Sequence, residues 1–253
     1  MNRAIRVILT LCIILFVVSG AIALPLVVRP FYYSQIEKLG IPESTGYSVE
    51  DARKAYDEMM DYCMGKSEEF GTGKLAWSDE GKSHFDDCKA LFTLDKRLFI
   101  LSLEGIAICI GFICALYNVT RATRGGDTLR KDGTRNEVGN AKWGLKIALL
   151  DETLTAGAQA GIIMLFLSMV LGVMGAVNFE VFFVKFHHTF FPGKENWLFD
   201  PAKDEIIKIL PEAFFRNCAI LIVSVIVLVS IALIVMGAFR KKNNQRGAVA
   251  DVL

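Results

Sequence analysis

The sequence lacks the motifs that mark several large enzyme and metal-binding classes. It has no GxSxG turn to present a serine nucleophile and no HExxH pair to bind zinc. Six cysteines are present, yet they form neither a CxxC pair nor a zinc-finger spacing with histidine. Histidine itself is scarce, with three residues in 253. These absences argue against a serine hydrolase of the nucleophile-elbow type, a zincin protease and a structural zinc domain.

An excess of charge of one sign is also lacking, since the net charge is +1 at pH 7. Proteins that bind nucleic acids carry a basic excess, so we expect no nucleic-acid partner. Apolar residues are abundant instead, at 53% of the chain, which is more than a soluble domain usually carries. They fall into four blocks, each close to the roughly 20 residues that cross a bilayer, at residues 7–28, 98–117, 156–177 and 217–239. The sequence therefore predicts a mainly α membrane protein with four transmembrane helices.

Basic residues flank these blocks unevenly and predict the orientation of the chain. They cluster before the first block, after the second and after the fourth. The start of segment 1–28, the loop 118–155 and the tail 240–253 are therefore predicted to be cytoplasmic. Residues 29–97 and 178–216 then form the two parts of an extracytoplasmic domain that caps the helices. The tripeptide at 21–23 resembles a signal-peptidase site, but the apolar run is longer than a usual signal core, so we expect it to remain as a span.

Capping signals predict where helices begin outside the apolar blocks. Residues 48–51, SVED, resemble a capping box. Residues 78–80, SDE, open a second external helix. Asp200 before Pro201 predicts the start of a third, short one.

Two further patterns surround the third span. An apolar stripe beside lysines over residues 141–155 predicts a helix that lies on the inner leaflet. Small residues at 156–161 open the span and would permit close helix packing.

The cysteines divide into two groups. Four fall inside predicted spans, where we interpret them as small packing residues. Cys63 and Cys88 lie in the first external loop, where an oxidising exterior would permit a disulfide. Their spacing leaves a disulfide and two free thiols as equal alternatives.

All three histidines, His84, His187 and His188, lie in the predicted external loops. Histidine can both accept and donate a proton near neutral pH. Asp87 lies one helical turn from His84, a spacing at which a carboxylate can fix the ring tautomer. If His84 and His187 converge, one could act as a general base while the other donates to a developing oxyanion.

Two other interpretations of the same residues stay open. Zinc could be held by these histidines together with Asp86 and Asp87, although the spacing matches no established zinc motif. Alternatively, the histidines could pack at the membrane interface without chemistry of their own.

Two stretches of the external loops resemble motifs of a bacterial family of four-span membrane proteins, the lipoprotein intramolecular transacylases. They are residues 78–92, SDEGKSHFDDCKALF, and residues 186–215, FHHTFFPGKENWLFDPAKDEIIKILPEAFF. The large first external loop agrees with that family as well. Two features depart from it. Cys88 stands where the family usually has valine, and the cytoplasmic connection 121–150 looks longer than expected.

The resemblance implies an enzyme at the outer face of the bacterial cytoplasmic membrane. Such enzymes move one acyl chain from the diacylglyceryl group on a lipoprotein's N-terminal cysteine to that cysteine's own α-amino group, which gives a lyso-form lipoprotein. The implied partners are diacylglyceryl-modified lipoproteins and membrane lipids, and neither cofactor nor metal is expected. The family's essential histidines match His84 and His187. Supporting or substrate-binding roles would fall to Asp86, Asp87, His188, Trp197, Asp200 and Arg216.

Two other functions compete with this intramolecular O-to-N acyltransferase. The first is a non-enzymatic membrane protein whose external domain binds a lipid or a partner and whose histidines are structural. The second is a metal-dependent membrane hydrolase.

Overall fold

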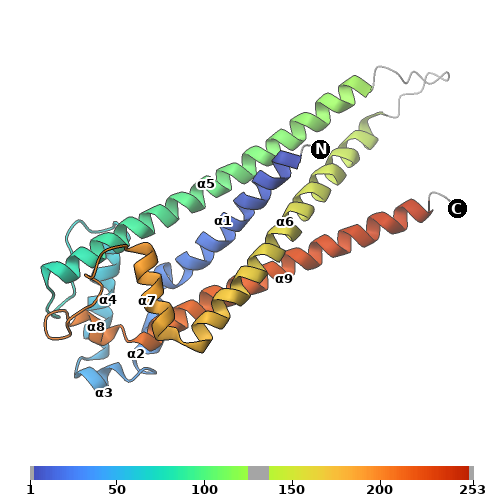
Figure 1. Cartoon of the computed structure of the whole chain (residues 1–253). Coiled ribbons are helices and arrows are strands. Elements are labelled where there is room, and N and C mark those ends of the chain that lie inside the picture. Colours follow the sequence, from blue (N-terminus) through green and yellow to red (C-terminus); the bar gives the residue numbers. More distant parts are fainter. Residues whose placement is uncertain (1–2, 125–136, 251–253) are drawn as a thin grey trace, which may run out of the picture. The chain divides into compact units, whose positions relative to one another are not determined.

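The computed structural model describes the backbone of residues 3–124 and 137–250, and the side chains of residues 3–120 and 145–240. Within these residues the secondary structure is helical and no strand forms. The long helices are α1 (Arg3–Val27), α5 (Asp79–Arg124), α6 (Glu137–Val177) and α9 (Glu212–Ala250) (Figure 1). Each contains a stretch long and apolar enough to cross a membrane, which confirms the four predicted spans. The short helices are α2 (Arg29–Ile36), α3 (Ile41–Thr45), α4 (Val49–Cys63), α7 (Phe179–Phe190) and α8 (Ile206–Ile209).

The helices divide between two compact units. The first consists of residues 1–17, 99–166 and 227–253, and the second of residues 18–98 and 167–226. In the first unit an ion pair at 2.9 Å joins Arg6 of α1 to Glu152 of α6. Beside it lies a small apolar cluster drawn from α1, α5 and α6, formed by Ile5, Leu9, Cys109, Ile113 and Ala156.

Helices α6 and α9 approach each other closely in the first unit. A Cβ atom on Gly161 would lie 2.7 Å from the backbone carbonyl oxygen of Ser230, so a larger residue would push the helices apart. The same holds at Gly237, where a Cβ atom would meet the Cβ of Ala158 at 2.7 Å. The small residues predicted at 156–161 to permit close packing are therefore confirmed in that role.

The second unit has its core where the short helices meet. The ring of Tyr32 on α2 stacks on that of Tyr56 on α4, with 3.8 Å between centroids, and Phe214 of α9 meets Tyr32 edge-on. Tyr32 is fully buried, and its hydroxyl donates a hydrogen bond of 3.0 Å to the carbonyl oxygen of Ile209. These contacts hold the end of α8 and the start of α9 against α2 and α4.

The predicted helix starts are confirmed in one external segment and corrected in another. Ser48 caps α4 as a full capping box, because its Oγ accepts from the backbone N–H of Asp51 while the Asp51 carboxylate accepts from that of Ser48. No helix begins at Pro201. Asp200 instead accepts from the backbone N–H two residues ahead and forms a turn, and α8 begins only at Ile206. The short Asp200 side chain can close either structure, so the local sequence did not distinguish them.

Helices α5 and α6 are longer than the predicted spans. α5 begins at Asp79, as the capping signal predicted, and continues past residue 97, where the sequence indicated a boundary between external domain and span. α6 likewise joins the segment 141–155, predicted to lie on the inner leaflet, to the third span. The side chains of residues 141–144 lie outside the described part of the chain. Charged residues near 95–97 change the polarity of α5 without ending it, because lysine and arginine are good helix formers.

Both external cysteines are free thiols in the structure. Cys63 is buried on α4, with its Sγ 3.9 Å from the backbone carbonyl oxygen of Phe85. Cys88 lies on α5 and contacts His84 instead. Of the two alternatives left by the sequence, the structure favours free thiols.

Candidate active site

His84 lies in the second turn of α5, whose first turn is fixed by a buried carboxylate. The Oγ of Ser78 accepts from the backbone N–H of Gly81, which caps the helix. Asp204 accepts in turn from the backbone N–H and the hydroxyl of Ser78, at 2.8 and 2.9 Å. A Cβ atom on Gly81 would lie 2.1 Å from Asp204 Oδ1, so only glycine allows this approach. The segment before α8 therefore fixes the start of the helix that carries His84.

His187 lies in the last turn of α7, a helix capped by the side chain of Asn178. Its Nδ1 is 2.8 Å from the carbonyl oxygen of Phe183, one turn earlier. A carbonyl oxygen can only accept, so Nδ1 carries the proton of this bond. In the neutral ring Nε2 is then unprotonated and free to accept a proton.

The structure brings His84 and His187 together, which was the condition for joint chemistry. Their ring centroids lie 5.7 Å apart with an interplanar angle of 36°. Both residues are buried, at 5% and 6% exposure. Two imidazoles from helices α5 and α7 therefore share one water-poor site.

Aromatic rings form the walls of this site. Phe191 lies against both histidines, with ring centroids 5.1 Å from His84 and 5.8 Å from His187. Phe199 meets the edge of His84 at 5.4 Å, and Trp197 stacks on His187 at 4.6 Å. These rings exclude water and offer few hydrogen-bond partners, so a polar group that enters the site must bond to the histidines or stay unpaired.

Burial keeps the His187 ring neutral. The loss of hydration disfavours the charged form and holds the pKa of His187 below its ordinary value of 6.5. The neighbouring His188 lowers this pKa further, while the hydrogen bond to Phe183 acts in the opposite direction. At pH 7 the Nε2 of His187 is therefore available as a base.

Asp87 makes its hydrogen bonds to the loop after α7 rather than to His84. Its carboxylate forms an ion pair with Lys194 and accepts a hydrogen bond of 3.0 Å from Asn196. The Nδ1 atom of His84 is buried and has no hydrogen-bond partner among the described residues. The orienting hydrogen bond expected from Asp87 to His84 is thus not made in the structure.

The other predicted site residues lie around this centre without touching both rings. Asp86 is exposed and bonds to Tyr62 and Lys82. His188 is exposed and meets Trp197 edge-on at 5.6 Å. Asp200 forms the turn described above, and Arg216 is exposed, with Glu212 at 3.8 Å.

Several long-range hydrogen bonds around the site were not predicted from the sequence. Lys194 and Asn196 reach Asp87 across more than 100 residues of sequence, and Asp204 reaches Ser78 across 126. No local periodicity or motif signals such long-range pairs. Trp197 was named beforehand only through the resemblance of residues 186–215 to the family's motif.

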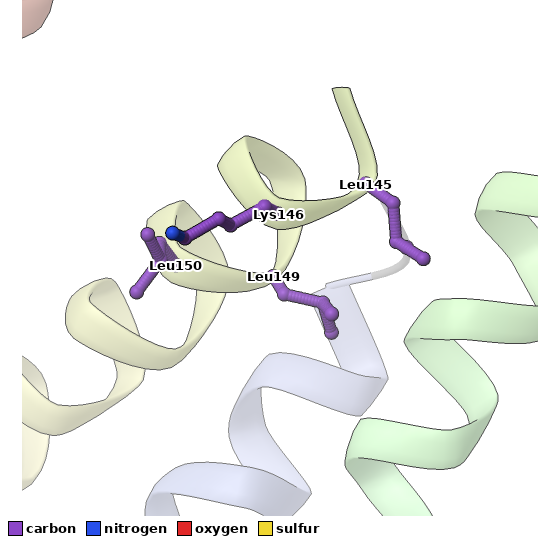
Figure 2. Close-up of a pocket in the computed structure, with 4 residues that line it drawn as sticks. All are labelled: Leu145, Lys146, Leu149 and Leu150. Carbon is purple, nitrogen blue, oxygen red and sulfur yellow. The ribbon is translucent and has the colours of Figure 1, made fainter. Parts of the chain in front are cut away.

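The described residues give no support to a zinc site. Among them, no group of three or more histidine, cysteine, aspartate or glutamate side chains is placed to hold a metal ion. A shallow depression in the first unit lies along one face of α6 and is lined by Leu145, Lys146, Leu149 and Leu150 (Figure 2). These residues carry no pair of groups suited to acid–base chemistry.

Four spans and a buried, aromatic-walled histidine pair define a helical membrane protein with a candidate acid–base site. The sequence matches the model of a family described as lipoprotein intramolecular transacylase Lit, over residues 7–215. The chain belongs to this family, as the two motifs predicted.

The solved structures agree with this assignment. The membrane-integral lipoprotein intramolecular transacylase Lit from Bacillus cereus is 22% identical, with a TM-score of 0.74 over 97% of this chain and 98% of that one. Two variants of that protein, with one histidine replaced by arginine or by alanine, match at 21% identity with TM-scores of 0.68 and 0.69. These matches cover 98% and 97% of this chain, and 95% and 96% of theirs. At this identity they show a shared fold. The curated proteins give no match.

Proposed function

We propose that this protein moves an acyl chain within a bacterial lipoprotein, from the diacylglyceryl group on the N-terminal cysteine to the α-amino group of that cysteine. The product is a lyso-form lipoprotein. Membership of a transacylase family supports the reaction class. The observation that carries the proposal is the pair of buried imidazoles, His84 and His187, with ring centroids 5.7 Å apart.

His187 is the general base in this mechanism. Its Nδ1–H bonds to the Phe183 carbonyl, so Nε2 holds a lone pair. The α-amine gives up a proton to Nε2 as its nitrogen attacks the ester carbonyl carbon. A new N–C bond forms, and a tetrahedral oxyanion develops.

The same proton completes the reaction. When the tetrahedral intermediate collapses, the ester C–O bond breaks and the glyceryl oxygen leaves as an alkoxide. The imidazolium of His187 returns its proton to that oxygen, so the proton count balances and no cofactor is needed. His84 supplies a hydrogen bond to the oxyanion, in a site where few other donors compete.

Two features of the arrangement favour transfer over hydrolysis. The amine and the ester belong to one molecule, so holding that molecule in place supplies much of the rate. Phe191, Phe199 and Trp197 exclude water, which would otherwise compete as nucleophile. Asp87 and Trp197 support this site, whereas we assign Asp86, His188, Asp200 and Arg216 to its periphery.

The proposal includes a location. The basic flanks of the spans support an orientation with both termini in the cytoplasm and the histidine pair at the outer face of the bacterial cytoplasmic membrane. Diacylglyceryl-modified lipoproteins are anchored at that face, and membrane lipids surround the spans.

Mass spectrometry of a reporter lipoprotein tests the reaction. The protein would be expressed in a bacterium that leaves lipoproteins in the diacylglyceryl form. We expect the wild type to yield an N-terminal peptide with one acyl group on the amine and a monoacylglyceryl thioether. His187→Gln should yield none of this product, whereas the exposed neighbour His188→Gln should still yield it.

Two results would contradict the proposal. An unchanged diacylglyceryl peptide in all samples, despite good membrane expression, would favour the non-enzymatic lipid- or partner-binding protein. Product formation that stops when a chelator is added would favour a metal-dependent enzyme.

A further inference from the structure

Cys88 makes a contact for which the mechanism above gives no reason. Its Sγ lies 3.5 Å from Nε2 of His84, one helical turn earlier on α5. Residues four apart on a helix are neighbours, so this contact is built into the helix itself. The other ring nitrogen of His84, Nδ1, is buried without a partner among the described side chains and backbone groups.

The chemistry of the two groups decides how the contact is made. A neutral imidazole has one donor nitrogen and one acceptor nitrogen. A thiol can donate its hydrogen, but its sulfur is only a weak acceptor, whereas an unprotonated ring nitrogen is a good acceptor. The arrangement with S–H donating to Nε2 is therefore favoured over the reverse.

We propose that Cys88 is a positioning residue, whose thiol donates to Nε2 of His84 and fixes the tautomer with its proton on Nδ1. The ring then holds a buried N–H donor that no group among the described residues uses. His187 holds the complementary arrangement, with its proton on Nδ1 bonded to the Phe183 carbonyl and an open acceptor at Nε2. One ring is prepared to donate and the other to accept.

The opposite hydrogen-bonding states of the two rings suggest a role for His84 in the reaction. This role rests on the proposed function. The Nδ1–H of His84 is available for the oxyanion that develops when the amine attacks. If the proton moved to Nε2, Nδ1 would present a lone pair to a negative oxygen and destabilise it. The thiol therefore acts on the reaction through the histidine, without contact with the substrate.

Nitrogen-15 NMR of the ring nitrogens tests the tautomer directly. Protonated and unprotonated ring nitrogens give well-separated signals, and the chain has only three histidines. The signals of His84 are those missing from His84→Gln. We expect a protonated Nδ1 in the wild type and in Cys88→Ser, whose hydroxyl also donates. Cys88→Val has no donor and should show a mixture of tautomers.

Activity gives the second readout. Cys88→Val should convert the reporter lipoprotein about five-fold more slowly, the size expected for one lost hydrogen bond to the ring. Cys88→Ser should retain most of the rate. Cys63→Val is the matched control, because the Sγ of this buried thiol lies 3.9 Å from the Phe85 carbonyl oxygen and makes no hydrogen bond to a histidine among the described residues. It should leave both the His84 signals and the rate unchanged.

Two outcomes would overturn the proposal. One is a Cys88→Val protein with the wild-type His84 signals, and the other is a Cys88→Ser protein that folds but shows mixed tautomers. If the signals change as expected while even the wild type makes no lyso-form product, the role of Cys88 stands and the proposed function fails. The two claims can thus be judged separately.

Discussion

The indole ring of Trp197 stacks on the imidazole ring of His187, with 4.6 Å between centroids and an interplanar angle of 27°. The indole N–H donates a hydrogen bond of 3.0 Å to the carbonyl oxygen of Lys194. Trp197 is therefore fixed at its polar edge while its face covers the catalytic histidine proposed above. The stack joins the loop after α7 to the last turn of α7.

We expect Trp197→Leu to slow transfer by about tenfold, because an aromatic stack is worth roughly 1 kcal/mol beyond burial and its loss also admits water. Trp197→Phe should keep more of the rate, since it retains a ring. Single-turnover conversion of the reporter lipoprotein measures both. Trp77→Leu is the control, because Trp77 packs edge-on against Phe70 and makes no ring contact with a histidine among the described residues. A Trp197→Leu protein as fast as the wild type would show that the stack has no catalytic effect.

The pH dependence of the rate follows from the neutral His187 ring. Burial lowers the pKa of His187 below 6.5, so the base form persists as the pH falls to that value. The α-amine of the substrate also titrates, with an ordinary pKa of about 8, and it must be neutral to attack. We therefore expect the rate, divided by the neutral fraction of that amine, to stay level from pH 8 to about pH 6.5 and to fall only in more acidic solution. Rates measured in mixed detergent–lipid micelles across this range check the prediction, and a fall of this corrected rate centred above pH 7 would contradict it.

The free energy of unfolding should also depend on pH. In the unfolded chain this histidine titrates near its ordinary pKa, whereas in the folded protein its pKa is lower. The unfolded state therefore binds more protons below pH 6.5, and the free energy of unfolding falls as the pH drops through that range. We expect His187→Gln to weaken this acid destabilisation, as measured by the unfolding temperature at pH 5 and pH 7.

Asp87 and Lys194 should act as one unit. Their ion pair is partly exposed, so its contribution to stability is at most about 1 kcal/mol. Its effect on the rate should be of similar size, because it holds the loop that positions Trp197. Asp87→Asn and Lys194→Met should each slow transfer about five-fold, and the double variant should be no slower than either. Additive losses in this cycle would show that the two residues act independently.

Gly81→Ala should disrupt the start of α5. The added Cβ would lie 2.1 Å from Asp204 Oδ1 and 3.2 Å from the Phe199 ring, so the Asp204 segment must move. We expect a lower unfolding temperature and a loss of transfer of at least tenfold, since the cost of such overpacking is about 1–3 kcal/mol. Gly111→Ala is the control, because its Cβ would meet no atom within 4 Å. Equal behaviour of the two variants would contradict the packing argument.

Tyr32→Phe should lower stability without a direct effect on chemistry. The substitution removes the hydroxyl that bonds to the buried carbonyl of Ile209 and leaves that oxygen unpaired, at a cost of about 1–3 kcal/mol. Thermal unfolding in detergent measures the loss. The rate of the folded fraction should match the wild type, and a selective loss of rate would assign Tyr32 a role in the site.

The sequence predicted the features that depend on local composition. Four apolar blocks identified the spans because crossing a bilayer demands a fixed length of apolar helix. The capping box at Ser48 could be recognised in the sequence because it involves only residues that are three positions apart. His84 and His187 were predicted as site residues from the chemistry of their side chains and from the motifs around them, and the structure brings the two rings together.

The remaining features depend on contacts between distant segments. Asp87 was expected to orient His84, its neighbour on the helix, yet its carboxylate bonds to Lys194 and Asn196 from a loop more than 100 residues away. Asp200 closes a turn rather than a helix. In both cases the local sequence fits two structures, and tertiary contacts choose between them.

The aromatic rings around His84 and His187 disfavour a net charge in the space between the two histidines. Phenylalanine rings contact the His84 imidazole, and a charge formed in such surroundings is poorly solvated. In the proposed reaction, the α-ammonium group of the substrate would therefore lose one proton before it reaches the histidines and would transfer the second to an imidazole ring. The positive imidazolium would then lie beside the negative oxyanion. The aromatic surroundings would thus couple proton transfer to bond formation in the proposed reaction.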